Sequence, residues 1–216
     1  DDIGVSGTVT ATTDYVFRGV SQNDEQPALQ GSIDFTHTPT GLYAGVWASP
    51  VDFNDDGEAF VEIDAYGGYS HEIGAFSGDL RGIYYWYPGA DSILNYDYFE
   101  IAYDGTYDFG FLQIGAMYAY SPEFFSEAGD AHYIQGHLNV PIENGFYSFA
   151  SIGKQFVDDN ETYGFPDIVD WTAGLGWEYD RVDVQLAYVD TNASKTECED
   201  GCEPRVVLTG TINYGE

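Results

Sequence analysis

The sequence of residues 5–22 is VSGTVTATTDYVFRGVSQ. Its first half alternates small or apolar residues with serine and threonine, the period-two pattern of a β-strand that has one apolar face. Its second half carries Arg18, one of only six basic residues in a chain of 216. We predict a first strand over about residues 3–16, with Arg18 projecting from its end into the lumen of a closed barrel among carboxylates. The alternative is a surface arginine at a strand end.

The same alternation recurs along the whole chain, without any long stretch of helical periodicity. It predicts twelve strands in all. After the first, they cover about residues 27–38, 42–53, 60–73, 78–88, 96–107, 111–121, 131–143, 146–157, 168–179, 182–191 and 205–214.

The connections between these strands alternate in length. Those after the even-numbered strands are short, and Asn144-Gly145 is a strong hairpin signal because both residues tolerate positive φ. Those after the odd-numbered strands are longer and carry most of the acidic residues. This asymmetry favours one domain over residues 1–216: an all-β, up-and-down antiparallel transmembrane barrel with short periplasmic turns and longer acidic outer loops. A soluble sandwich or lipocalin has no need for such sidedness.

The composition is strongly acidic. The 37 acidic and 6 basic residues give a formal charge of −31, which argues against nucleic acid or an anionic bilayer surface as a partner. With 44% hydrophobic and 17% aromatic residues the chain is too apolar to be disordered. No apolar run approaches the roughly 20 residues of a membrane helix, whereas membrane barrels use alternating segments of ~10 residues. Asp1 resembles a mature end left by signal cleavage, so we expect the protein in the cell outer membrane.

We assign the polar face of the strands to the lumen and the apolar face to lipid. Aromatic residues gather at both strand ends, as in the girdles of membrane barrels. The long-loop group is Trp86, Tyr87, Tyr96, Tyr120, Trp171 and Tyr188, and the short-turn group is Tyr69, Tyr103, Trp177, Tyr179 and Tyr214.

This orientation places many carboxylates in or near the lumen. They are Asp14, Asp34, Glu62, Asp64, Glu100, Asp104, Asp170 and Glu178. Arg18 and Arg81 are the counter-charges, and we expect them to pair with Glu62, Asp64 and Glu100. Lys154 lies in a strand of poor alternation and is assigned to neither face. Because acids outnumber bases, an open path would favour cations; the alternative is a plugged interior that conducts nothing.

Two loops carry further candidate sites. Cys198 and Cys202, the only cysteines, lie in one acidic loop and predict a small disulfide ring; a metal site is the rival interpretation. An oxygen-rich run formed by Asp52, Asn54, Asp55, Asp56 and Glu58 is a candidate Ca²⁺ site. Simple solvation is its alternative, since the run lacks EF-hand spacing. No other cofactor is expected.

Three early segments resemble the TorF family of porins: Thr12-Thr13-Asp14-Tyr15-Val16-Phe17-Arg18-Gly19 with Ser21-Gln22, Pro27-Ala28-Leu29-Gln30-Gly31, and residues 41–49, GLYAGVWAS. Residues 62–69 (EIDAYGGY), residues 84–89 (YYWYPG) and Asp170-Trp171 resemble it as well. The likeness spans nearly the whole chain and implies an outer-membrane barrel of a Gram-negative bacterium with a pore role. It supplies no substrate. These barrels usually end on an aromatic residue, whereas Gly215-Glu216 follows Tyr214 here.

The function expected from the sequence is passive diffusion of small solutes or ions through a porin-like channel. The rival is a non-conducting structural or binding barrel whose acidic outer loops bind divalent cations, lipopolysaccharide, a second copy or a surface protein. The four histidines, His37, His71, His132 and His137, show no Ser/His/Asp arrangement, so we expect no enzymatic activity.

Overall fold

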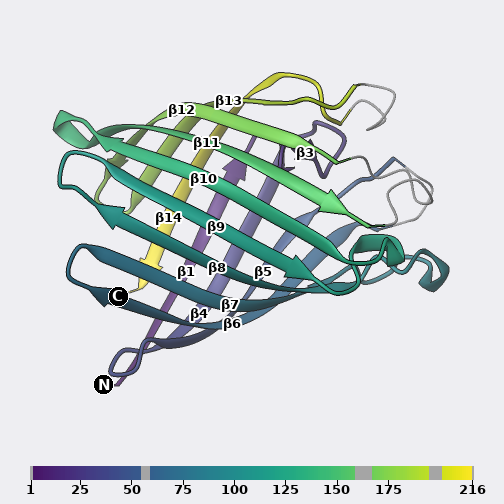
Figure 1. Cartoon of the computed structure of the whole chain (residues 1–216), viewed down its shortest axis with the longest axis horizontal. Helices are drawn as coiled ribbons and strands as arrows, with labels where there is room; N and C mark the ends of the chain where they lie inside the picture. Colours follow the sequence, from purple (N-terminus) through teal and green to yellow (C-terminus); the bar gives the residue numbers. More distant parts are fainter. Residues whose placement is uncertain (1, 55–58, 159–166, 195–200, 216) are drawn as a thin grey trace.

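A computed structural model describes residues 2–54, 59–158, 167–194 and 201–215. These residues form a closed antiparallel barrel of twelve strands, in which each strand pairs with its sequence neighbours and β1 pairs with β14 (Figure 1). Thr8 faces Asn213 of β14 on one side and Ser32 of β4 on the other, so the first strand seals the wall. Closure leaves no open strand edge, as a spanning sheet requires.

The wall strands are β1 (Ile3–Thr12), β4 (Ala28–His37), β5 (Leu42–Pro50), β6 (Val61–Ile73), β7 (Phe76–Trp86), β8 (Tyr98–Asp108), β9 (Gln113–Ser121), β10 (Ala131–Pro141), β11 (Phe146–Val157), β12 (Val169–Tyr179), β13 (Val182–Thr191) and β14 (Arg205–Gly215). Two strands of two residues each, β2 (Val16–Phe17) and β3 (Val20–Ser21), form a separate hairpin. The described helices are the 3₁₀ turns η1 (Ser92–Leu94), η2 (Phe125–Glu127) and η3 (Glu143–Gly145). None of them has the length and apolar character needed to cross a membrane.

The predicted strand number and sidedness are confirmed. The short connections gather at one end of the barrel together with both chain termini, and the long connections gather at the other end (Figure 1). We call these the short-turn end and the long-loop end. At the predicted Asn144-Gly145 hairpin, both residues have positive φ (62° and 81°), as expected.

The wall has an apolar outer face and a polar inner face. Outward side chains such as Leu29, Ile33, Ile152 and Leu175 are each about 60% exposed or more, whereas the alternate residues of the same strands turn into the barrel. Exposed hydrophobic side chains of this kind ring the described wall, far beyond the isolated apolar patches of a soluble protein. An apolar outer face of this kind is typical of a transmembrane β-barrel.

The first strand is shorter than predicted. It ends at Thr12, and residues 13–22 turn into the barrel instead of extending the wall. Within them β2 and β3 pair Val16 with Ser21 and Phe17 with Val20. The tight reversal places Arg18 at φ 48° and Gly19 at φ 83°. A side chain on Gly19 would be strained at this φ and would collide with Asp170 at the start of β12 and Thr191 at the end of β13. We call residues 13–22 the plug.

Candidate pore interior and its plug

The tip of the plug is an arginine enclosed by the wall. Arg18 donates to both carboxylate oxygens of Glu100 on β8, from Nη2, at 2.8 and 2.7 Å, and Nη1 donates to Oε1 of Gln155 on β11 at 3.2 Å. Its guanidinium lies 4.2 Å from the ring centre of Tyr133 on β10 and 4.6 Å from that of Phe17. The Arg18 and Glu100 side chains are only 8% and 4% exposed. The predicted lumen position of Arg18 and its pairing with Glu100 therefore match the structure.

Two contacts with wall carboxylates hold the plug inside the barrel. Burial alone would lower the pKa of Arg18, but the Glu100 carboxylate together with Tyr85 and Tyr98 outweighs burial, so the pKa is raised and the guanidinium keeps its charge. Burial, followed by the Glu62 carboxylate, raises the pKa of Tyr15 well above its ordinary value. The Tyr15 phenol therefore remains a donor, and it donates to Oε1 of Glu62 at 3.0 Å. The plug thus presents a cation and a hydroxyl to two inward carboxylates.

A second ion pair fixes the base of the plug. Arg205 at the start of β14 contacts Oδ2 of Asp14 at 2.8 Å and Glu25 at 3.4 Å, and Ser21 donates to the other oxygen of Asp14 at 2.7 Å. The sequence reasoning missed Arg205. The scarcity that singled out Arg18 applied equally to Arg205, but its strand is distant in sequence from Asp14 and becomes a neighbour only through closure of the barrel.

The remaining predicted lumen acids of this half also lie inside. Glu62 and Asp170 are 1% and 3% exposed, and Asp64 lies two residues beyond Glu62 on the same face of β6. The Tyr133 hydroxyl donates to the Asp170 carboxylate, with its two oxygens at 3.1 and 3.0 Å. Tyr133 fits because its diagonal neighbour on β11 is Gly153, where a Cβ would collide with the phenol. Glu100 therefore pairs with the guanidinium at the plug tip, Asp170 holds the Tyr133 ring beside it, and Glu62 accepts the hydroxyl of Tyr15.

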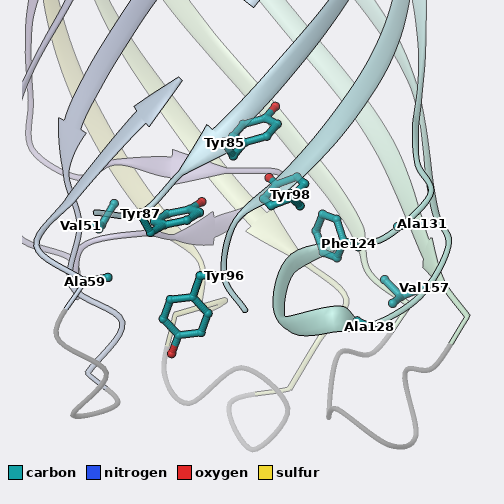
Figure 2. Packing of buried hydrophobic residues seen from close by; sticks show 10 residues of the cluster. All are labelled: Val51, Ala59, Tyr85, Tyr87, Tyr96, Tyr98, Phe124, Ala128, Ala131 and Val157. Atoms are coloured by element: carbon teal, nitrogen blue, oxygen red, sulfur yellow. The ribbon is translucent and has the colours of Figure 1, made fainter. Parts of the chain in front are cut away.

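Aromatic side chains close the mouth above the plug. Tyr85 and Tyr98 stack with ring centres 4.2 Å apart, Phe124 meets Tyr98 at 4.9 Å, and Phe17 of the plug meets Tyr85 at 6.0 Å. Figure 2 shows Tyr85, Tyr98 and Phe124 together with Tyr87 and Tyr96 at the long-loop end. Tyr87 and Tyr96 are 5% and 7% exposed, so their prediction as girdle residues was wrong. Tyr87 follows the end of β7 and Tyr96 precedes the start of β8, where the chain bends inward over the lumen.

The other half of the lumen, towards the short-turn end, is more open. Asp34 accepts a short hydrogen bond from Tyr66, and Asp79 accepts one from Tyr43 at 2.7 Å. Two hollows open at this end. One of about 690 Å³ is lined in part by Asp79 and Asp104, and one of about 790 Å³ is lined in part by His137.

The predicted pairing of Arg81 was wrong. Arg81 faces the lumen, but its Nη1 lies 3.4 Å from Asp79 on the same strand, and its Nη2 lies 3.8 Å from the Met117 sulfur. Glu62, Asp64 and Glu100 lie nearer the long-loop end, and the described ion pair of Arg81 is with Asp79. Arg81 and Asp79 are 36% and 26% exposed, so water solvates this pair. A residue two positions along the same strand face is the nearest partner, which the sequence reasoning did not consider.

Three further sequence predictions concern residues outside this interior. Lys154, left unassigned, turns outward with Nζ 4.4 Å from the Phe156 ring centre. Cys202 is disulfide-bonded and buried, and Cys198 lies outside the described residues.

The candidate Ca²⁺ run is only partly described. Asp52 accepts a hydrogen bond from the Asn54 backbone at 3.0 Å, whereas Asp55, Asp56 and Glu58 lie outside the described residues. Across the described residues, no group of three or more His, Cys, Asp or Glu side chains is arranged for a metal ion. Calcium binding by the run stays a prediction.

Solved structures similar to this chain are outer-membrane channels. The KdgM porin aligns with a TM-score of 0.67 at 7% identity, over 97% of this chain and 99% of KdgM. KdgM in complex with disordered oligogalacturonate aligns with a TM-score of 0.62 at 6% identity, over 98% and 99%. The COG4313 outer membrane channel of Pseudomonas putida F1 aligns with a TM-score of 0.56 at 10% identity, over 99% and 94%. At these identities the likeness establishes the fold.

In sequence, no curated protein matches the chain. Residues 2–210 match the model of a family described as bacterial proteins of unknown function, Gcw_chp. This match extends from β1 into β14 and includes the plug. The chain therefore belongs to the Gcw_chp family.

Proposed function

We propose that the protein is an outer-membrane channel for small solutes or ions that favours cations, and that it is a porin of the TorF type. The described wall is a closed barrel with an outward apolar face, and its structural relatives are outer-membrane channels. In this proposal the short-turn end faces the periplasm and the acidic long loops face outward, where they meet lipopolysaccharide and the surroundings of the cell.

The observation that carries the cation preference is the excess of inward carboxylates. Glu62, Asp64, Glu100 and Asp170 turn into the long-loop half of the lumen, and Arg18 of the plug pairs with Glu100. Carboxylates in excess over cations along a pore wall favour cations and repel anions. The KdgM structure holds oligogalacturonate, a polyanion. The same carboxylates argue against such a substrate for this chain.

The plug bears on whether the barrel conducts. Because Arg18 and Glu100 are buried and bonded across the lumen, a solute passes the long-loop half only when the plug moves. This feature favours a second candidate, a non-conducting barrel whose loops bind divalent ions, lipopolysaccharide, a second copy of the chain or a surface protein. We propose no catalytic role and no nucleic-acid partner, and the channel remains our first proposal because the lumen is lined with charge.

Single-channel conductance in a planar bilayer with a salt gradient tests the proposal. We expect rare, brief cation-selective openings from the wild-type barrel and longer openings from Arg18→Ala, because loss of the buried ion pair loosens the plug. Arg81→Ala serves as the matched lumen control, and it should change the size of the steps more than their duration. A silent bilayer for all three barrels, with insertion verified by protease protection, would leave the binding barrel as the better proposal.

A further inference from the structure

The wall around Arg18 has the composition of a receptor for a planar cation. Glu100 supplies two carboxylate oxygens that meet one guanidinium nitrogen at 2.7 and 2.8 Å, and Gln155 supplies an amide oxygen at 3.2 Å to another. The Tyr133 ring covers one face of the guanidinium at 4.2 Å. Carboxylate oxygens at the edge and an aromatic ring on the face are the two features that distinguish guanidinium recognition from simple charge pairing.

These groups belong to the wall and remain when the plug leaves. Glu100, Tyr133 and Gln155 lie on β8, β10 and β11, within the regular register of the barrel. Asp170 on β12 holds the Tyr133 hydroxyl, and this contact orients the ring towards the guanidinium. Phe17, by contrast, is part of the plug and withdraws with it. A pocket that is already assembled in the wall costs little ordering entropy to occupy.

We propose that this pocket is a binding subsite of the channel for small organic cations that carry a guanidinium group, and that Arg18 occupies it in the closed state as a tethered substitute for such a solute. This inference rests on the proposed channel function in one respect, because an external cation reaches the pocket through the lumen. It adds to that function a class of solute and a reason for the plug to open, since a solute competes directly with Arg18.

The other lumen arginine provides the contrast. Arg81 has one carboxylate contact at 3.4 Å and a sulfur at 3.8 Å, and its side chain is 36% exposed. Among the described contacts it has no aromatic face and no carboxylate that meets it through both oxygens. Removing its side chain therefore leaves a solvated gap, whereas removing the Arg18 side chain leaves a lined pocket with an uncompensated carboxylate.

Chemical rescue of the Arg18→Ala barrel tests the subsite. The purified barrel in detergent micelles is heated with millimolar guanidinium chloride, and separately with ammonium chloride or sodium chloride at equal ionic strength. We expect guanidinium to restore most of the unfolding temperature lost in the variant, with half-maximal effect at a concentration about tenfold lower than for ammonium. The Arg81→Ala barrel should show no difference among the three salts.

Equal responses of the two variants, or equal responses to guanidinium and ammonium, would overturn the subsite. If Arg18→Ala does not fold alone, its refolding yield with each salt gives the same comparison, and no gain with guanidinium counts against the proposal. Adding Glu100→Gln to Arg18→Ala should abolish the rescue. This readout needs no current. If guanidinium raises the unfolding temperature of Arg18→Ala but no barrel conducts, the subsite stands and the channel function is rejected. If the barrels conduct but guanidinium does not change the unfolding temperature, the channel function stands and the subsite is rejected.

Discussion

Both halves of the lumen contain arginine–carboxylate pairs, but these pairs are buried at one end and solvated at the other. At the long-loop end Arg18 and Arg205 are buried against Glu100 and Asp14, and they fix the plug to the wall. At the short-turn end Arg81 lies beside Asp79 in contact with water. A buried charge whose partner is removed is costly to leave unpaired, whereas a solvated pair is worth little. The burial of an ion pair, more than the number of charges, therefore decides whether it holds the plug in place or only lines the lumen.

The largest effect should come from Arg18→Ala. It leaves Glu100 buried without its counter-charge, and we expect a loss of about 3–5 kcal/mol in unfolding free energy. Urea unfolding in detergent, followed by tryptophan fluorescence, measures it. The double variant Arg18→Met with Glu100→Leu should recover most of this loss, because both charges are gone. A loss below that of Arg81→Ala would erase the contrast between the halves.

Arg205→Ala should rank second, at about 2–3 kcal/mol. Asp14 loses a cation in a buried place but keeps the hydroxyl of Ser21. The loss should be detected by the same unfolding experiment, accompanied by faster proteolysis within residues 13–22 as the base of the plug loosens. Lys at this position should recover part of the stability. Unchanged proteolysis would show that the tip alone holds the plug.

Tyr133→Phe distinguishes the contribution of the aromatic ring to stability from that of the hydroxyl. The variant keeps the aromatic face under Arg18 but removes the donor to Asp170, and we expect a cost of about 1–2 kcal/mol. The unfolding midpoint of this variant measures it, with Tyr147→Phe in the open half as the matched control. Tyr147 donates to Asp183 at 2.6 Å in a more exposed setting, so its loss should cost less. Equal losses would contradict the distinction.

Arg81→Ala should give the smallest effect, less than about 1 kcal/mol. Its pair with Asp79 is partly solvated, and raising the salt concentration should leave even this small difference undetected. The unfolding midpoint at low and high salt provides the measurement. A loss as large as that of Arg205→Ala would show that the short-turn half is drier than its exposed side chains indicate.

The wall was predictable because each strand carries its own signal. Alternation, short turns and a hairpin at Asn144-Gly145 are local, and closure follows from the need to remove edges. The inward position of Glu62, Asp64, Glu100 and Asp170 follows from the same alternation. The strand count and the strand positions agree with the structure to within a few residues at most ends.

The interior was less predictable because its contacts join distant strands. The alternation of Tyr15, Val16 and Phe17 is the same for a wall strand and for a hairpin inside the barrel, so the first strand was extended too far. The carboxylate that pairs with Arg81 depends on the positions of the residues along the barrel axis. Period-two alternation predicts the face of a residue but not this position. The partnership of Arg205 with Asp14 needs the β1–β14 seam.

The plug leaves the wall at Thr12 and the chain re-enters it at Ala28, and these two residues face each other across β1 and β4. A two-residue turn is enough to join facing residues of a hairpin. Residues 13–27 can thus be replaced by a two-residue turn without shifting the register of any strand. In the proposed channel, a change confined to this single connection would therefore convert a plugged barrel into an unplugged one with the same wall.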